Sequence, residues 1–295
     1  MLSYGADTGS RRMRLEAALL RRLPPRWRRQ ARRLLYLPAD ALDNLLGRRR
    51  ELVPPRGMIS AGAGDFEAIG EHYLGYLRQH AGLGPDSRVL DVGCGIGRMA
   101  APMTRFLERG TYDGIDVAAA DLRWCRRHIG RRHPSFRFHH ADVYHREYNP
   151  GGGLAAVDYR FPFPEGSFDV VLASSLFSHL LAAEAGHYLA EISRVLAPGG
   201  TSFLTFFLLN DESRGLIDAG ACGLVFRIPA GGAWVHDEKN PEAAVAYDES
   251  FIRELHARNG LEIAEPLLYG CWCCREEYTS YQDIVIARKG LDGRG

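Results

Sequence analysis

Lysine is almost absent from this chain of 295 residues: the positive charges are arginines except at Lys239 and Lys289. No glycine-rich stretch is followed by Lys-Ser or Lys-Thr, which excludes the phosphate-binding loop of nucleoside triphosphatases. No apolar run approaches the length of a membrane-spanning helix, and we expect no secretory signal. Six cysteines in a chain of this length do not predict a disulfide framework. We therefore expect a protein of the reducing cytoplasm.

The net charge of +1 conceals an uneven distribution of charge. Arginines crowd residues 10–56, so the remainder of the chain is acidic by compensation. Leucines at helical spacing among these arginines predict three short amphipathic helices, separated by prolines, over residues 11–23, 26–36 and 40–46. Two interpretations stay open for this extension, residues 1–57. Its apolar sides pack on the rest of the protein with the arginines in water, or it makes peripheral contact with an anionic membrane.

The most informative stretch is residues 88–99, Arg-Val-Leu-Asp-Val-Gly-Cys-Gly-Ile-Gly-Arg-Met. Its apolar half suits a buried strand, and a helical pattern begins near Met99. The glycines between them would leave bare backbone N–H groups beside a ligand, since they have no Cβ atom to hold it away. The spacing is G-x-G-x-G, whereas the dinucleotide-binding fingerprint is G-x-G-x-x-G.

This stretch resembles the first motif of class I S-adenosylmethionine-dependent methyltransferases, and residues 194–200, Arg-Val-Leu-Ala-Pro-Gly-Gly, look like the late motif of that family. The likeness is strong over residues 66–209 and holds in outline over 248–288. It implies a Rossmann-like, doubly wound sheet of seven strands with the last strand antiparallel. It also implies S-adenosyl-L-methionine as the cofactor and methyl transfer as the activity.

The chain beyond the extension alternates between strand and helix patterns, which predicts a parallel α/β sheet in one domain, residues 58–295. The predicted strands are 88–92, 111–116, 135–139, 168–173, 201–208, 261–268 and 281–287. The predicted helices are 66–80, 97–107, 119–131, 183–196 and 248–259. Two insertions, 148–166 and 210–247, follow strands at the carboxyl edge of the sheet, where ligands bind in such folds. We interpret them as walls of a substrate pocket, the second forming a cap.

Acidic residues end three successive strands, the pattern expected for an adenosine-containing cofactor. Asp116 can accept hydrogen bonds from both ribose hydroxyls. By the resemblance, Asp142 would accept from the adenine amino group, with a backbone N–H near Val143 at a ring nitrogen. Asp113, at the start of its strand, is expected on the surface. The predicted cofactor-binding residues are Asp91, Gly93, Cys94, Gly95, Gly97, Asp116, Val117, Asp142, Val143 and Ser174.

The predicted general base is His179, which follows the fourth strand at the expected position of the methyl group and titrates near neutrality. His236 and Asp237, in the second insertion, are reserve candidates. Cys271, Cys273 and Cys274 have the spacing C-x-C-C and lack a second pair of ligands, so no metal site is expected. The arginines are not interleaved with aromatic residues along a stripe, so no nucleic-acid partner is expected.

We therefore predict an enzyme that methylates a small-molecule acceptor, resembling the bacterial enzymes that tailor metabolites, with a hydroxyl of a sugar or other metabolite as the first choice. Methylation at nitrogen or carbon is the alternative. A nicotinamide-dependent oxidoreductase on a similar sheet is a further alternative that the glycine spacing disfavours. A non-catalytic scaffold that keeps the cofactor fold is the third.

Overall fold

The computed structural model describes residues 23, 25–48, 50–59, 64–220 and 222–291. The helix predicted over residues 11–23 lies outside the described residues except for Leu23. The chain divides into two compact units. The smaller comprises Met1–Gly75, Cys94–Glu108 and Tyr112–Ala155, and the larger comprises Tyr76–Gly93, Arg109–Thr111 and Ala156–Gly295.

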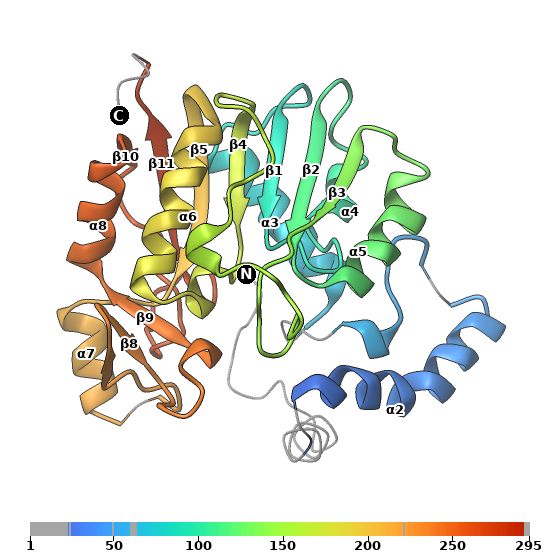
Figure 1. Cartoon of the computed structure of the whole chain (residues 1–295), viewed down its shortest axis with the longest axis horizontal. Helices are drawn as coiled ribbons and strands as arrows, with labels where there is room; N and C mark the ends of the chain where they lie inside the picture. Colours follow the sequence, from blue (N-terminus) through green and yellow to red (C-terminus); the bar gives the residue numbers. More distant parts are fainter. Residues whose placement is uncertain (1–22, 24, 49, 60–63, 221, 292–295) are drawn as a thin grey trace. The chain divides into compact units, whose positions relative to one another are not determined.

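The main sheet has seven strands in the order β10-β11-β5-β4-β1-β2-β3 (Figure 1). The pairs β1–β4, β4–β5 and β2–β3 are parallel, whereas β11 runs antiparallel to both β5 and β10. The predicted doubly wound sheet with an antiparallel last strand is therefore confirmed. The strands are β1 (Arg88–Val92), β2 (Thr111–Asp116), β3 (Phe136–His140), β4 (Phe168–Ala173), β5 (Leu196–Phe206), β10 (Leu261–Ile263) and β11 (Asp283–Lys289).

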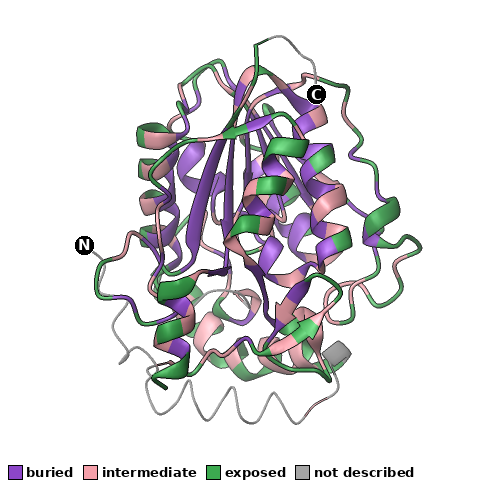
Figure 2. Ribbon diagram, turned by 90° about the vertical axis from the view of Figure 1, so that its left-hand side faces the viewer, coloured by how far each residue is buried: buried purple, intermediate pink, exposed green. Residues whose placement is uncertain are grey.

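These strands form where the sequence has short runs of apolar and β-branched residues, and most of their residues are buried (Figure 2). Four stretches of the main fold differ from prediction. The strand expected over 261–268 ends at Ile263, since Pro266 cannot donate to a ladder. Pro198-Gly199-Gly200 lies inside β5 as an irregularity in its pairing with β4, not before the strand. The helix expected over 97–107 is helical only over α4 (Ala100–Met103). The helix expected over 119–131 consists of α5 (Ala119–Cys125) and a π-helical turn over Arg126–Gly130.

The larger unit carries α6 (Ala182–Val195) and α8 (Glu249–Arg258) close to their predicted positions. Its second insertion folds into a second sheet with the strand order β6-β9-β8-β7 (Figure 1). These strands and their helix are β6 (Leu208–Leu209), α7 (Asp211–Asp218), β7 (Ile228–Ala230), β8 (Ala233–Val235) and β9 (Val245–Asp248). Phe207 and Phe226 share a buried cluster with Trp272 and Cys273, which come from the segment before β11. The insertion therefore shares a buried core with the segment before β11.

In the N-terminal extension, α2 (Pro25–Leu45) is one continuous helix. The prediction of two helices separated at Pro38 was wrong. Pro38 removes one backbone donor and leaves the carbonyl of Leu34 without its helical partner, but Leu34 is 71% exposed, so water can satisfy that carbonyl. α3 (Phe66–His80) matches its prediction.

Candidate active site

The glycine motif adopts the conformation that its composition requires. Gly93, Gly95 and Gly97 all have positive φ, at 82°, 53° and 78°. At Gly97 the left-handed φ strains any residue with a side chain, and a Cβ would also approach Ile129 Cδ1 to 2.9 Å. A Cβ at Gly95 would meet nothing within 4 Å, so the space beside this residue is open. The loop thus turns tightly and presents its backbone, as a ligand-binding turn must.

Asp116 is held by this loop within the smaller unit. Its Oδ2 accepts a hydrogen bond of 2.7 Å from the Gly95 N–H, and its Oδ1 accepts one of 2.7 Å from the Ala118 N–H. Burial raises the pKa of Asp116, while these two backbone donors act in the opposite direction. Each carboxylate oxygen keeps acceptor capacity, so the orientation suits a ligand with two neighbouring hydroxyl groups.

A second acidic group lies close to Asp116 in the same unit. Asp121, in the first turn of α5, is 4% exposed and forms an ion pair with Arg29 of α2. The Arg29 guanidinium also lies 5.2 Å from the centroid of the Tyr148 ring, a cation–π geometry. Burial raises the pKa of Tyr148 to about 12, so its hydroxyl is neutral at ordinary pH. Sequence reasoning missed this cluster; the only signal was Arg29 and Arg33 on one face of a predicted helix.

The third predicted acid, Asp142, is exposed and follows β3. The side-chain amide of Asn149 donates to the Val143 carbonyl at 3.0 Å and approaches Asp142 Oδ1 at 3.4 Å. Val143 also pairs with Leu154 across a bridge, which closes the loop between them. The ring Nε2 of His140 lies 3.2 Å from the Val117 carbonyl and fixes the backbone after β2.

Asp113 corrects one expectation. Asp113 is 2% exposed and is not a surface residue. Its carboxylate can be buried because the Arg137 guanidinium and the His139 ring, both on β3, contact it. Arg137 contacts both carboxylate oxygens, at 3.0 and 2.7 Å, and His139 Nε2 lies 2.7 Å from Oδ1. Burial acts to raise the pKa of Asp113, but the hydrogen bonds from His139 and Arg137 outweigh it and hold that pKa below its usual range.

In the larger unit, the end of β4 carries a polar network that sequence reasoning also missed. Ser175 has φ of 57°, unusual for a residue other than glycine. Its N–H donates to Thr205 Oγ1 at 2.7 Å, and its hydroxyl donates to the buried Gln282 Oε1 at 2.8 Å. Strained backbone held by such contacts is frequent at functional sites. The preceding Ser174 is partly exposed. Asp91, the second-last residue of β1, is 1% exposed.

His179 ends a short helix, η4 (Phe177–His179), directly after this network. Its Nδ1 lies 2.7 Å from the carbonyl oxygen of Glu242, which belongs to the second insertion. A carbonyl only accepts, so Nδ1 donates this hydrogen bond, and in the neutral form of the ring the lone pair is at Nε2. The buried Tyr247 hydroxyl donates to the Phe177 carbonyl at 2.9 Å and further fixes η4.

The reserve candidates share no hydrogen bond with His179 in the described part of the chain, although the His236 backbone N–H donates to the carbonyl of Ala244, two residues after Glu242. His236 and Asp237 are both exposed; the ring Nδ1 of His236 contacts the Val225 backbone, and Asp237 accepts from the Lys239 N–H. Among the described residues, no three metal-ligating side chains are grouped to hold an ion. The part of the chain that the structure describes also has no helix long and apolar enough to cross a membrane.

Comparison with known proteins agrees with this geometry. Residues 89–200 match the family model of the methyltransferase domain. The chain is 36% identical over 130 residues to phthiotriol/phenolphthiotriol dimycocerosates methyltransferase 1 of Mycobacterium ulcerans, covering 42% of this chain and 39% of that protein. It is 35% identical over 124 residues to the fatty-acid O-methyltransferase of Mycolicibacterium smegmatis, covering 42% of this chain and 36% of that one. The matches thus span less than half of each curated relative.

Among solved structures, the PH0226 protein of Pyrococcus horikoshii has the same fold, with a TM-score of 0.52 at 16% identity over 77% of this chain and 92% of that one. Residues 89–200 therefore form a methyltransferase domain of class I, whose methyl donor is S-adenosyl-L-methionine. The resemblance that the glycine motif indicated is confirmed.

Proposed function

We propose that the protein transfers a methyl group from S-adenosyl-L-methionine to a hydroxyl oxygen of a small-molecule metabolite. The observation that carries this proposal is the clamped carboxylate of Asp116, set between two backbone donors beside three glycines of positive φ. These residues fit the adenosyl group, because they combine open space at Gly95 with an oriented pair of acceptors for the ribose hydroxyls.

When bound, the cofactor would supply an electrophilic methyl carbon: the acceptor oxygen would bond to it in line as the carbon–sulfur bond breaks, with S-adenosylhomocysteine as the leaving group. The protein need not supply a nucleophile and acts mainly by positioning and by removing a proton. Asp116 binds the ribose, and Asp142 with the backbone at Val143 binds the adenine. His179 accepts the acceptor's proton at Nε2, since Nδ1 is committed to the Glu242 carbonyl. Ser174 and the network at Ser175 lie at the end of β4, directly before η4 and His179.

A second candidate acceptor is a carboxylate, which the name of one relative, a fatty-acid O-methyltransferase, favours. A carboxylate is already ionised near neutral pH and needs no general base. The nitrogen or carbon atoms of metabolites are further acceptors to test. The family match gives no support to a nicotinamide-dependent reaction.

The binding test uses S-adenosylhomocysteine and NADH with the full chain. S-adenosylhomocysteine at a hundred times its dissociation constant should stabilise the fold by roughly 2.7 kcal/mol, and NADH should not. Acceptors are then profiled with a labelled methyl donor, comparing long-chain alcohols, fatty acids and sugars. Stabilisation by NADH alone would overturn the proposal. Transfer only to nitrogen or carbon acceptors would retain the cofactor assignment and overturn the hydroxyl.

A further inference from the structure

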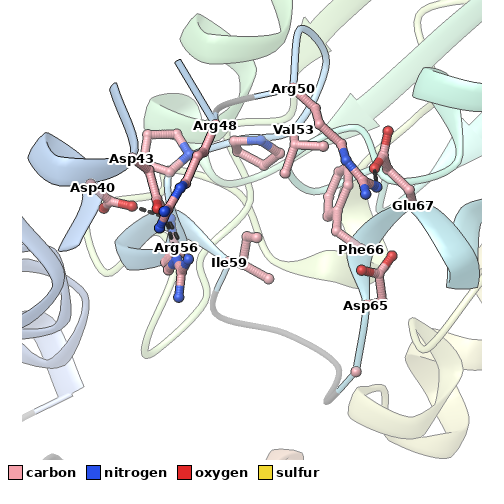
Figure 3. Close-up of a pocket in the computed structure, with 13 residues that line it drawn as sticks. Asp40, Asp43, Arg48, Arg50, Val53, Arg56, Ile59, Asp65, Phe66 and Glu67 are labelled. Carbon is pink, nitrogen blue, oxygen red and sulfur yellow. Dashed lines mark hydrogen bonds and ion pairs between the residues drawn. The ribbon is translucent and has the colours of Figure 1, made fainter. Parts of the chain in front are cut away.

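Helix α2 is fixed to the smaller unit through its charged face. Arg29 pairs with the buried Asp121 of α5, and Asp40 accepts hydrogen bonds from the backbone N–H groups of Arg56 and Gly57, the first at 2.8 Å. Figure 3 shows Asp40 and Asp43 pointing towards Arg56, whose guanidinium pairs with Asp43 at 2.7 Å. A Cβ at Gly57 would come within 2.8 Å of Arg33 Cα, so glycine permits the close packing of the two segments.

The opposite face of α2 is apolar and exposed. Positions 27, 34, 38, 41 and 45 follow one another at helical spacing and carry Trp, Leu, Pro, Ala and Leu. Leu45 is 83% exposed, and Leu34 is 71% exposed. We call the exposed large residues of this region the apolar stripe: Trp27, Leu34, Leu35, Leu37, Leu42, Leu45 and Leu46.

This orientation is the reverse of one interpretation of the sequence, in which the apolar sides pack on the protein and the arginines face water. The stripe holds seven of the twelve large hydrophobic residues that are exposed in the described part of the chain. Such a concentration on one helix and the residue that follows it marks an interaction surface, because scattered exposure is the norm elsewhere.

We infer that the apolar stripe of α2 docks on an anionic lipid surface. The charge of the same segment selects this occupant: residues 10–56 contain fourteen arginines and only four acidic residues. A second copy of the chain would bring the same positive charge against it, whereas acidic lipid headgroups attract it. A helix with an apolar face, flanking arginines and a tryptophan at the boundary lies in the plane of the interface. The inference depends on α2 and the charge of the surrounding segment, and not on the proposed activity.

The test is co-sedimentation of the full chain with vesicles of phosphatidylcholine containing about one third phosphatidylglycerol, compared with phosphatidylcholine alone. Binding is expected only to the anionic vesicles and should weaken by about tenfold or more when salt rises from about 0.1 M to 1 M. The triple variant Leu34→Ser/Leu42→Ser/Leu45→Ser should lose binding by at least about tenfold at low salt. The matched control, Leu154→Ser/Leu291→Ser, changes exposed leucines outside α2 and should bind as the parent does.

Tryptophan fluorescence gives a second readout at the stripe itself. Trp27 is 49% exposed, whereas Trp124 and Trp272 are buried and Trp234 is partly buried. Anionic vesicles should shift the emission to shorter wavelength, and Trp27→Phe should remove that shift. Circular dichroism and binding of S-adenosylhomocysteine verify that each variant is folded. Absence of binding to anionic vesicles, or equal binding by the triple variant, overturns the inference. So does a dimer in sedimentation velocity that the triple variant converts to monomer.

Discussion

Arg29 of α2 forms an ion pair with Asp121 of α5, and this arginine connects the N-terminal extension to the surroundings of Asp116. Asp121 acts to raise the pKa of Asp116, whereas Arg29 acts to lower it. Removing the arginine would therefore leave two neighbouring carboxylates in a buried region with less positive charge to balance them. The extension contributes to the electrostatics of Asp116, the proposed ribose-binding acid, beyond the simple packing or membrane contact that its sequence indicated.

We predict that Arg29→Gln destabilises the protein by about 2 kcal/mol, because the buried Asp121 loses its hydrogen-bonded partner and keeps only more distant positive groups, among them Arg33 at 3.7 Å. The double variant Arg29→Gln/Asp121→Asn should recover most of this loss, since the buried charge disappears with its partner. Denaturant unfolding measures both values. As a control, Arg105→Gln removes an exposed ion pair with Glu71 and should cost less than about 1 kcal/mol. Equal losses in the Arg29 and Arg105 variants would contradict a special role for Arg29.

Asp116→Ala is predicted to weaken binding of S-adenosylhomocysteine by roughly 1.5–3 kcal/mol, about ten- to a hundredfold, because two ribose hydroxyls lose their acceptor. Calorimetry measures the dissociation constant. The matched control is Asp113→Asn on the same strand. The Asp113 carboxylate contacts Arg137 and His139. That control should lower stability and leave affinity unchanged. If Asp116→Ala folds and binds like the parent, the ribose assignment is wrong.

His256 should make stability depend on pH. It is fully buried in α8, and burial lowers its pKa to about 4 from an ordinary value near 6.5. The unfolded chain therefore binds a proton more readily than the folded chain between about pH 6.5 and 4. Stability is full above about pH 6.5 and falls by about 3 kcal/mol as the pH falls towards 4.

His256→Phe should flatten this part of the stability profile, since phenylalanine cannot titrate and fits beside Phe206, which the histidine ring already contacts edge-on. Denaturant unfolding at several pH values between about 4 and 7 gives the slope. His236→Gln, which changes an exposed histidine, should keep the slope of the parent. An unchanged slope in His256→Phe would show that other groups carry the pH dependence.

The main sheet could be predicted because its information is local. Each strand is a short apolar run, the glycine motif follows the first one directly, and acids mark the strand ends, as Asp116 shows. The clamp on Asp116 follows from the motif too, since the loop that needs glycine also carries the N–H of Gly95.

The remaining features depend on contacts distant in sequence. Asp113 looked like a surface residue because its partners Arg137 and His139 lie on another strand. The second sheet consists of strands of two to four residues, too short to show an alternating pattern. Arg29 and Asp121 are 92 residues apart in the sequence, and nothing in the sequence around either residue predicts that they pair. The network of Ser175, Thr205 and Gln282 joins three separate segments in the same way.

The last prediction concerns His179 and the identity of the acceptor. If the acceptor is a hydroxyl, His179→Ala should lower kcat about 10²–10⁴-fold with cofactor affinity nearly unchanged, because proton removal is lost while Asp116 still binds the ribose. The pH–rate profile should also lose the limb that reports the histidine. If the acceptor is a carboxylate, the same variant should lose less than about tenfold.

The control for this test is Glu242→Ala, which changes the residue that anchors His179 but keeps the carbonyl that does so. It should retain both the rate and the pH profile of the parent, since the tautomer of the histidine depends on a backbone oxygen. Glu242→Pro restricts the same backbone segment and should shift the pH profile towards that of His179→Ala. If His179→Ala methylates a hydroxyl acceptor with the pH profile of the parent, this histidine is not part of the mechanism. Calorimetry with S-adenosylhomocysteine tests the role of Asp116 independently.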